Sequence, residues 1–153
     1  MCNIMKKELF HNVNESEKVS WIRLSRSYNV GTKTMLKFLA IYGSLSQAIA
    51  EIQTLARENK SKIRIADEKS VSKEIKSVAK YEAKLICPFD DDYPNILLQI
   101  PDFPLILTVK GNLECLAAQS IAIVGSRNCS MVSKKFTESI ANRLAQKGYC
   151  ITS

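Results

Sequence analysis

The sequence predicts an α/β protein in which a small helical domain precedes a parallel sheet. Over residues 1–80, apolar residues recur three or four positions apart, as in amphipathic helices, whereas over 81–153 they gather in short continuous runs. Two of these runs, 120–124 and 149–153, flank a helical pattern at 130–147. That is the β-turn-α-β order of a parallel sheet with a right-handed crossover. We therefore expect domains over 1–80 and 81–153.

The composition is that of a globular protein. The chain has 153 residues, of which 46% are hydrophobic and 24% charged, and this excludes disorder throughout. No run approaches the roughly 18 to 20 apolar residues of a membrane span. The opening segment carries Lys6, Lys7, Glu8 and His11 where a signal peptide would be apolar. We expect a cytoplasmic protein without a membrane partner.

Cysteine and histidine usage indicates neither a metal site nor a catalytic pair. The five cysteines are widely spaced and form no CxxC pair, so we expect free thiols rather than disulfides or a zinc site. His11 is the single histidine, and no motif surrounds it. We therefore assign no catalytic residue, no metal and no cofactor.

The net charge of +7 lies entirely in the first domain. Residues 1–80 hold 15 basic and 8 acidic side chains, whereas residues 81–153 hold 7 of each. A basic module beside a neutral one indicates contact with a polyanion, for which nucleic acid is the commonest candidate. The alternative interpretation is a solvated helical surface.

Apolar stripes in the first domain predict four helices, within 19–28, 35–42, 45–56 and 71–79. Polar residues mark their ends. Asn14 and Ser16 can cap the first helix, Thr32 the second and Ser44 the third, while Gly43 can end the second. The first domain is thus predicted to be a bundle of short helices.

The second domain is predicted to contain strands within 84–87, 105–109, 120–124 and 149–153, with a helix over 130–147. Within that helix, Phe136, Ile140, Ala141 and Leu144 are spaced to face the sheet. We interpret this face as structural.

The turn between the strand at 120–124 and the helix is the best candidate site. Open α/β sheets bind ligands where a strand ends and a helix begins. Gly125 allows a tight turn, Ser126 and Ser130 offer hydroxyls, and Arg127 and Lys134 add positive charge. The N–H groups at a helix start also favour an anion. The turn therefore suits a phosphate.

Known nucleotide fingerprints are absent from this turn. Gly125 is its only glycine, so neither GxGxxG nor GxxxxGK[ST] is present, and NAD or ATP binding is not indicated. The alternative interpretation is an ordinary solvated β-α turn with Ser130 as the helix cap.

An ordered series of residues resembles the DNA-processing family DprA/Smf. It comprises Tyr93-Pro94, Leu97, Ile100, Asp102, Pro104, Gly111, Ile121 to Arg127, Ser130 and the helix up to Gly148. The resemblance covers about 84–153. The first part also resembles, more loosely, the sterile-alpha-motif-like (SAM-like) or helix-hairpin-helix-like domain that precedes the Rossmann-like domain in many members. The fold class expected is therefore α/β, with a SAM/helix-hairpin-helix-like domain before a truncated Rossmann-like parallel sheet.

The resemblance implies a non-enzymatic protein that binds single-stranded DNA and helps to load the RecA recombinase during natural transformation. It implies that Gly125, Ser126 and Arg127 hold a DNA phosphate, with Arg127 as the leading contact. We add Ser130 and Lys134, at the helix start, to the expected phosphate-binding residues. Members of the family are thought of as dimers through parts of the Rossmann-like domain that this chain largely lacks. The resemblance therefore gives little ground for expecting a homodimer.

Three departures from the family pattern qualify this reading. Val132 and Ser133 stand where the family usually has an aromatic residue and a glycine. Lys33 stands where a DNA-binding hairpin has its second glycine, so we favour a packing corner at 29–33. The family sheet also continues past the strand at which this sequence stops. We expect a fragment or the remnant of a split gene.

Two other classes of function stay open. A Rossmann-like nucleotide or phosphoribosyl hydrolase fragment would suit the phosphate-accepting turn, but it needs a carboxylate near the sugar and none is evident in the sequence. A small module that binds a partner protein through residues 1–80 is the other. Salt dependence separates them, because phosphate contacts weaken steeply with added salt.

Overall fold

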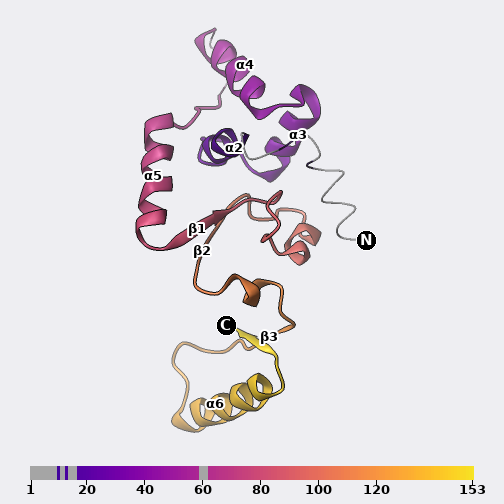
Figure 1. Ribbon diagram of the computed structural model, residues 1–153, viewed down its shortest axis with the longest axis vertical. Helices are drawn as coiled ribbons and strands as arrows, with labels where there is room; N and C mark the ends of the chain where they lie inside the picture. Colours follow the sequence, from indigo (N-terminus) through magenta and orange to yellow (C-terminus); the bar gives the residue numbers. More distant parts are fainter. Residues whose placement is uncertain (1–9, 11–12, 14–16, 59–61) are drawn as a thin grey trace. The chain divides into compact units, whose positions relative to one another are not determined.

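The computed structural model describes residues 10, 13, 17–58 and 62–153. In chain order it contains α2 (Lys18–Ser25), α3 (Thr32–Tyr42), α4 (Leu45–Arg57), α5 (Glu68–Lys80), β1 (Ala83–Ile86), the 3-10 helix η2 (Asn95–Gln99), β2 (Leu107–Lys110), η3 (Leu113–Leu116), β3 (Ser120–Ala122), α6 (Met131–Gln146) and β4 (Cys150–Thr152) (Figure 1). The chain divides into two compact units, Met1–Gly111 and Asn112–Ser153.

The first unit has its core between α2, α3 and α4. Trp21, Leu24, Met35 and Leu45 are fully buried there, in agreement with the predicted stripes. The second helix also buries Phe38, which the predicted stripe did not include, whereas Val19 and Tyr28 of the first stripe are exposed. The four helices form where the apolar spacing predicts them, because each can bury only one face.

The helix ends follow the predicted signals except at the end of α2, which stops at Ser25 and so before residue 28, and at the start of α3. Ser44 accepts a hydrogen bond from the backbone N–H of Gln47, and Gly43 takes the left-handed conformation, with φ of 68°, at the end of α3. Thr32 was wrongly expected as the cap of α3, because Gly31 occupies that position. The Thr32 hydroxyl instead donates to the carbonyl oxygen of Phe103 at 2.9 Å. Asn14 and Ser16 lie outside the described residues.

Strands β1 and β2 form an antiparallel pair that belongs to the first unit. Ala83 lies opposite Lys110, and Ile86 opposite Leu107. The segment before β2 packs on the helices, since the Trp21 indole donates to the carbonyl oxygen of Leu105 at 2.7 Å. The spatial division therefore falls after Gly111 rather than after residue 80. The sequence-based boundary between 80 and 81 stays a prediction about domains.

The second unit holds the β-α-β order expected at the end of the sequence. β3 and β4 are parallel, with Ser120 opposite Cys150 and Ala122 opposite Thr152, and α6 connects them. Ala141 and Leu144 of α6 are half-buried, but Phe136 is 66% exposed and Ile140 is also exposed, so the expected apolar face is only partly covered. The two strands have three residues each and are too short to cover a helix of 16 residues.

None of the described helices is both long and apolar enough to cross a membrane. Over the same residues, His, Cys, Asp and Glu side chains form no group of three that could hold a metal ion. No disulfide joins the described cysteines, which are Cys87, Cys115, Cys129 and Cys150.

Candidate functional site

The candidate site lies where β3 and β4 end and α6 begins, within the second unit (Figure 1). Beyond β3, the backbone N–H of Ile123 donates to the carbonyl oxygen of Thr152 at 2.8 Å, which extends the parallel pairing by one bond. Both strands therefore end at the same edge. The chain leaving β3 must turn there to enter α6, and this is the edge at which parallel α/β sheets bind ligands.

Ser130 begins α6 as its cap. Its Oγ accepts a hydrogen bond from the backbone N–H of Ser133 at 3.2 Å, and its carbonyl oxygen accepts one from the N–H of Lys134 at 3.0 Å. The cap leaves the N–H groups of Met131 and Val132 without an intrahelical partner, as at any helix start. These N–H groups carry the partial positive charge that favours an anion.

A short local turn shapes the segment before the cap. The backbone N–H of Asn128 donates to the Ser126 hydroxyl oxygen at 3.2 Å. The same hydroxyl lies 3.2 Å from the Asn128 carbonyl oxygen, to which it donates. Such serine turns hold a loop without a larger motif. Ser126 is thus ordered by its own loop and remains exposed.

A hollow of about 860 Å³ opens at this edge of the second unit. Four of the five predicted site residues line it, namely Gly125, Ser126, Ser130 and Lys134. Arg127 does not line it, and its side chain is exposed on the same turn. The structure thus brings the hydroxyls and the lysine together, and it leaves the guanidinium beside them.

Sequence reasoning missed several residues of the hollow. Asn128, Ser133, Thr137, Glu138 and Ser153 also line it. Glu138 matters most, because its side chain adds a carboxylate to the lining. It stands four residues after Lys134 and therefore shares one face of α6 with it. The spacing of four residues was the signal in the sequence that could have placed Glu138 at the site.

The hollow has positive charge at the start of α6 and negative charge one turn further along the helix. Lys134 and the helix start favour an anion, whereas the Glu138 carboxylate, one turn further along α6, opposes one. A ligand with a phosphate at the helix start and an uncharged part toward Glu138 fits this arrangement. A strand of nucleic acid and a nucleoside phosphate both have this character.

Two family descriptions match this chain. Residues 84–153 match the family described as DNA recombination-mediator protein A, and residues 15–77 match the DprA-like N-terminal HHH domain. The first match includes the whole turn from Gly125 to Lys134.

Two individual proteins are also similar. The chain is 44% identical over 55 residues to DNA processing protein DprA of Streptococcus pneumoniae, over 36% of this chain and 20% of that protein. It is 33% identical over 90 residues to Protein Smf of Borreliella burgdorferi, over 59% of this chain and 29% of that protein. The matched regions thus span less than a third of either relative's length.

Proposed function

Because the chain belongs to the DprA/Smf family of DNA-processing proteins, we propose that it binds single-stranded DNA through the turn between β3 and α6. The observation that carries the proposal is the hollow that gathers Gly125, Ser126, Ser130 and Lys134 around the start of α6. Exposed N–H groups, hydroxyls and one lysine suit a phosphate, and a single strand presents phosphates without requiring base recognition.

Arg127 is the proposed leading contact. Its exposed guanidinium lies on the turn, beside the hollow, where a strand that leaves the helix start would pass. A planar fork of donors can bind two phosphate oxygens at once. In this proposal the hollow holds one phosphate and Arg127 binds a neighbouring one.

The proposal extends to a cellular role. We expect a cytoplasmic, non-enzymatic protein that protects incoming strands in natural transformation and helps to load the RecA recombinase. The support is the family relationship together with a turn whose helix start and lysine suit an anion. The partner protein would meet DNA already held at the turn.

The binding proposal is tested by fluorescence anisotropy of a labelled oligothymidine strand. The purified chain is titrated at about 50 and 200 mM salt beside Arg127→Ala, Lys134→Gln and the control Lys147→Gln, which removes one charge at the far end of α6. We expect affinity that falls with salt and that is reduced about tenfold or more by either site substitution, but less than twofold by the control. Equal affinity of all four proteins would overturn the assignment of the turn.

Glu138 favours a second candidate function. A nucleotide or phosphoribosyl hydrolase needs a carboxylate near the sugar, and Glu138 supplies one in the same hollow as Lys134. The test is incubation of the chain with nucleoside monophosphates and separation of free base, sugar phosphate and phosphate by chromatography. Turnover that disappears in Glu138→Gln would favour the hydrolase, and absence of product would exclude it for those substrates.

A further inference from the structure

A line of four lysines follows one face of α5 in the first unit. Lys69, Lys73, Lys76 and Lys80 are spaced by four, three and four residues, and all four are exposed. At 3.6 residues per turn, this spacing places them within about 60° of one another around the helix. Val71, on the opposite face, is buried. We call these four residues the α5 lysine row.

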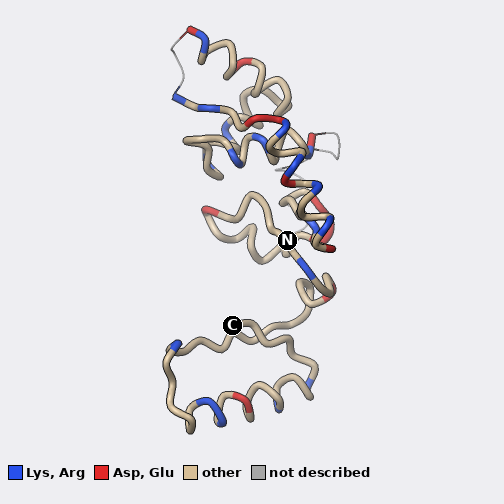
Figure 2. Tube along the Cα trace, turned by 90° about the vertical axis from the view of Figure 1, so that its left-hand side faces the viewer, with Lys and Arg blue, Asp and Glu red and all other residues tan. Residues whose placement is uncertain are grey.

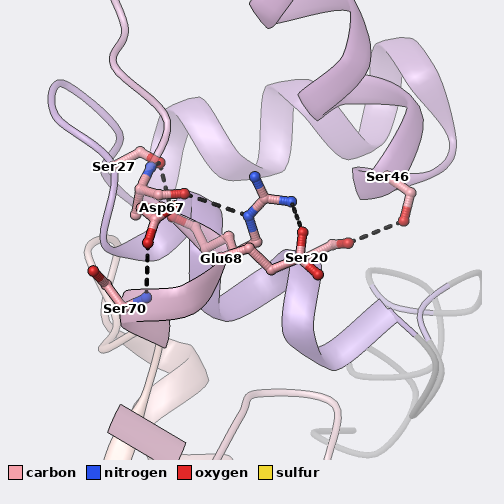
Figure 3. A network of polar contacts seen from close by, with 8 residues as sticks. Ser20, Ser27, Ser46, Asp67, Glu68 and Ser70 are labelled. Carbon is pink, nitrogen blue, oxygen red and sulfur yellow. Dashed lines mark hydrogen bonds and ion pairs between the residues drawn. The ribbon is translucent and has the colours of Figure 1, made fainter. Parts of the chain in front are cut away.

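The acidic residues near the row are engaged elsewhere. Glu68 pairs with Arg23 at 3.2 Å, and Glu74 pairs with Arg26 at 2.7 Å. Asp67 accepts from the backbone N–H of Ser70 as the cap of α5. Figure 3 shows Asp67, Glu68 and Ser70 at the start of this helix. Across the described part of the chain, no carboxylate pairs with the amines of the row.

The pairing at Glu74 is firm. Arg26 donates to it from Nε at 3.1 Å as well as from a terminal nitrogen at 2.7 Å, and this hydrogen bonding raises the pKa of the Arg26 guanidinium above its ordinary value. Arg23 of α2 and Arg26, directly after α2, thus neutralise the carboxylates of α5 on the side that packs against α2. The positive charge of the row remains without such a partner on the open side.

The row is unfavourable for the helix itself. Lys69 lies in the first turn of α5, where the helix dipole disfavours a cation. Lysines four apart on one face, such as Lys69 and Lys73 or Lys76 and Lys80, repel each other. Lys80, in the last turn, is favoured by the same dipole, so the cost lies at the start of the row and in the repulsion, which an external anion would relieve.

The shape around the row suits an extended anion. A shallow hollow of about 630 Å³ lies beside α5 and is lined by Asp67, Glu68, Lys69, Ser72, Lys73 and Lys76, with the two acidic residues at the start of the helix. From the first to the last lysine, α5 rises about 16 Å at 1.5 Å per residue. Each strand of a DNA duplex carries a charge roughly every 3.4 Å along the axis, and a single strand carries its charges less densely. The row is therefore long enough to meet several phosphates, at most one for each of its four lysines.

Other macromolecules fit this face less well. A membrane-surface helix needs a free apolar face, but Val71 of α5 is buried and Ile75 and Val78 are half-buried within the unit. Protein interfaces are depleted of lysine at their centres and rich in aromatic residues, and the row has no aromatic residue among its members. Figure 2 faces the side on which Figure 1 draws α5, and it shows lysine and arginine recurring along the first unit.

We propose that the α5 lysine row is a second contact surface for the backbone of single-stranded DNA, located on the first unit rather than at the turn before α6. The inference rests on the proposed function, because it assigns to the same ligand a further set of contacts. It gives the excess basic charge of residues 1–80 a defined place. Single-strand binding would then use two surfaces, one on each unit.

The test is a salt titration of the whole chain with labelled oligothymidine of about 20 nucleotides, followed by anisotropy. The test variant replaces the row by glutamine (Lys69→Gln, Lys73→Gln, Lys76→Gln and Lys80→Gln). The matched control removes the same charge from the same unit at exposed lysines outside the row (Lys33→Gln, Lys37→Gln, Lys84→Gln and Lys110→Gln). A third protein carries arginine at all four row positions and so keeps the charge.

We expect the slope of log affinity against log salt to become shallower by about 3 in the test variant, since each single-strand phosphate contact contributes about 0.7. The control should change by less than 1, and the arginine variant should keep the full slope. A test variant with an unchanged slope, or a control with an equal change, would overturn the row while leaving the proposed function standing. Absence of binding by the unmodified chain at low salt would overturn both.

A parallel titration with vesicles of anionic and of neutral lipids tests whether the row binds lipid headgroups rather than the phosphates of nucleic acid. Binding to anionic vesicles that needs the row and exceeds binding to oligothymidine would overturn the nucleic-acid assignment. Circular dichroism of each variant shows whether α5 is retained, and the arginine variant keeps the proposal falsifiable if the glutamine variant loses helix.

Discussion

The indole Nε1 of Trp21 donates a hydrogen bond to the carbonyl oxygen of Leu105 at 2.7 Å. Trp21 is fully buried in α2, and its ring meets that of Phe89 edge-on at 5.4 Å between centroids. A residue of the helical part is thus joined to two points of the segment that contains β1 and β2. Together with the hydrogen bond from Thr32 to Phe103, this contact joins the helices and the antiparallel strand pair into one unit.

Trp21→Phe should destabilise the first unit by about 2–3 kcal/mol. The smaller ring leaves a cavity, and the Leu105 carbonyl loses its donor in a partly buried position. Urea unfolding followed by circular dichroism measures the loss, with Tyr81→Phe as a control at an exposed aromatic residue. A loss below about 0.5 kcal/mol would show that the indole contact does not hold the unit together.

Glu17→Gln should cost about 1 kcal/mol of the free energy of unfolding. The Glu17 carboxylate accepts from the backbone N–H groups of Leu45 and Ser46, at 2.6 and 3.3 Å, and so adds negative charge at the start of α4. The amide keeps the length of the side chain but removes the charge. Glu51→Gln, at an exposed position within α4, is the control in the same urea experiment and should change stability by less than 0.5 kcal/mol.

The free energy of unfolding should fall between about pH 10 and 12 because of the titration of Tyr93. Burial raises the pKa of its phenol to about 12, and the hydroxyl donates to the carbonyl oxygen of Pro104 at 2.8 Å. The unfolded chain loses this proton near pH 10, whereas the folded chain keeps it to about 12, so stability present below pH 10 is lost as the pH rises.

The check compares the unmodified chain with Tyr93→Phe in urea unfolding from pH 8 to 11.5. The variant should be less stable at pH 8, by about 1 kcal/mol, because the Pro104 carbonyl loses its donor. Its stability should then fall less steeply than that of the unmodified chain above pH 10. Parallel curves for the two proteins would contradict the assignment of this alkaline transition to Tyr93.

Local signals in the sequence predicted local structure. Ser130 caps α6 and Ser44 caps α4 as expected, because a cap depends on residues three or four positions away. Thr32 failed as a cap because its hydroxyl binds Phe103, which is distant in sequence. No periodicity reveals such a partner. The same reason explains why the division of the chain after Gly111 was not predicted.

The candidate site was likewise predictable where it depends on local structure. The edge of the sheet and the helix start follow from the β-α-β order, and four of the five predicted residues do line one hollow. Glu138 was missed because helical spacing was used there only to find the apolar face. The exposure of Phe136 was missed because the extent of the two strands depends on pairing and not on their apolar composition.

Glu138→Gln should have opposite effects under the two candidate functions: it should abolish turnover by a hydrolase, but it should strengthen binding of DNA. If the hollow binds a DNA phosphate, removal of the carboxylate relieves repulsion near Lys134, and affinity for oligothymidine should rise about two- to threefold at low salt. The gain should shrink at high salt because the charges are exposed to solvent. Glu114→Gln, in the same unit but outside the hollow, is the matched control and should leave affinity unchanged. Lower affinity in Glu138→Gln would show that the carboxylate orders the site, and it would contradict the electrostatic account given for the hollow.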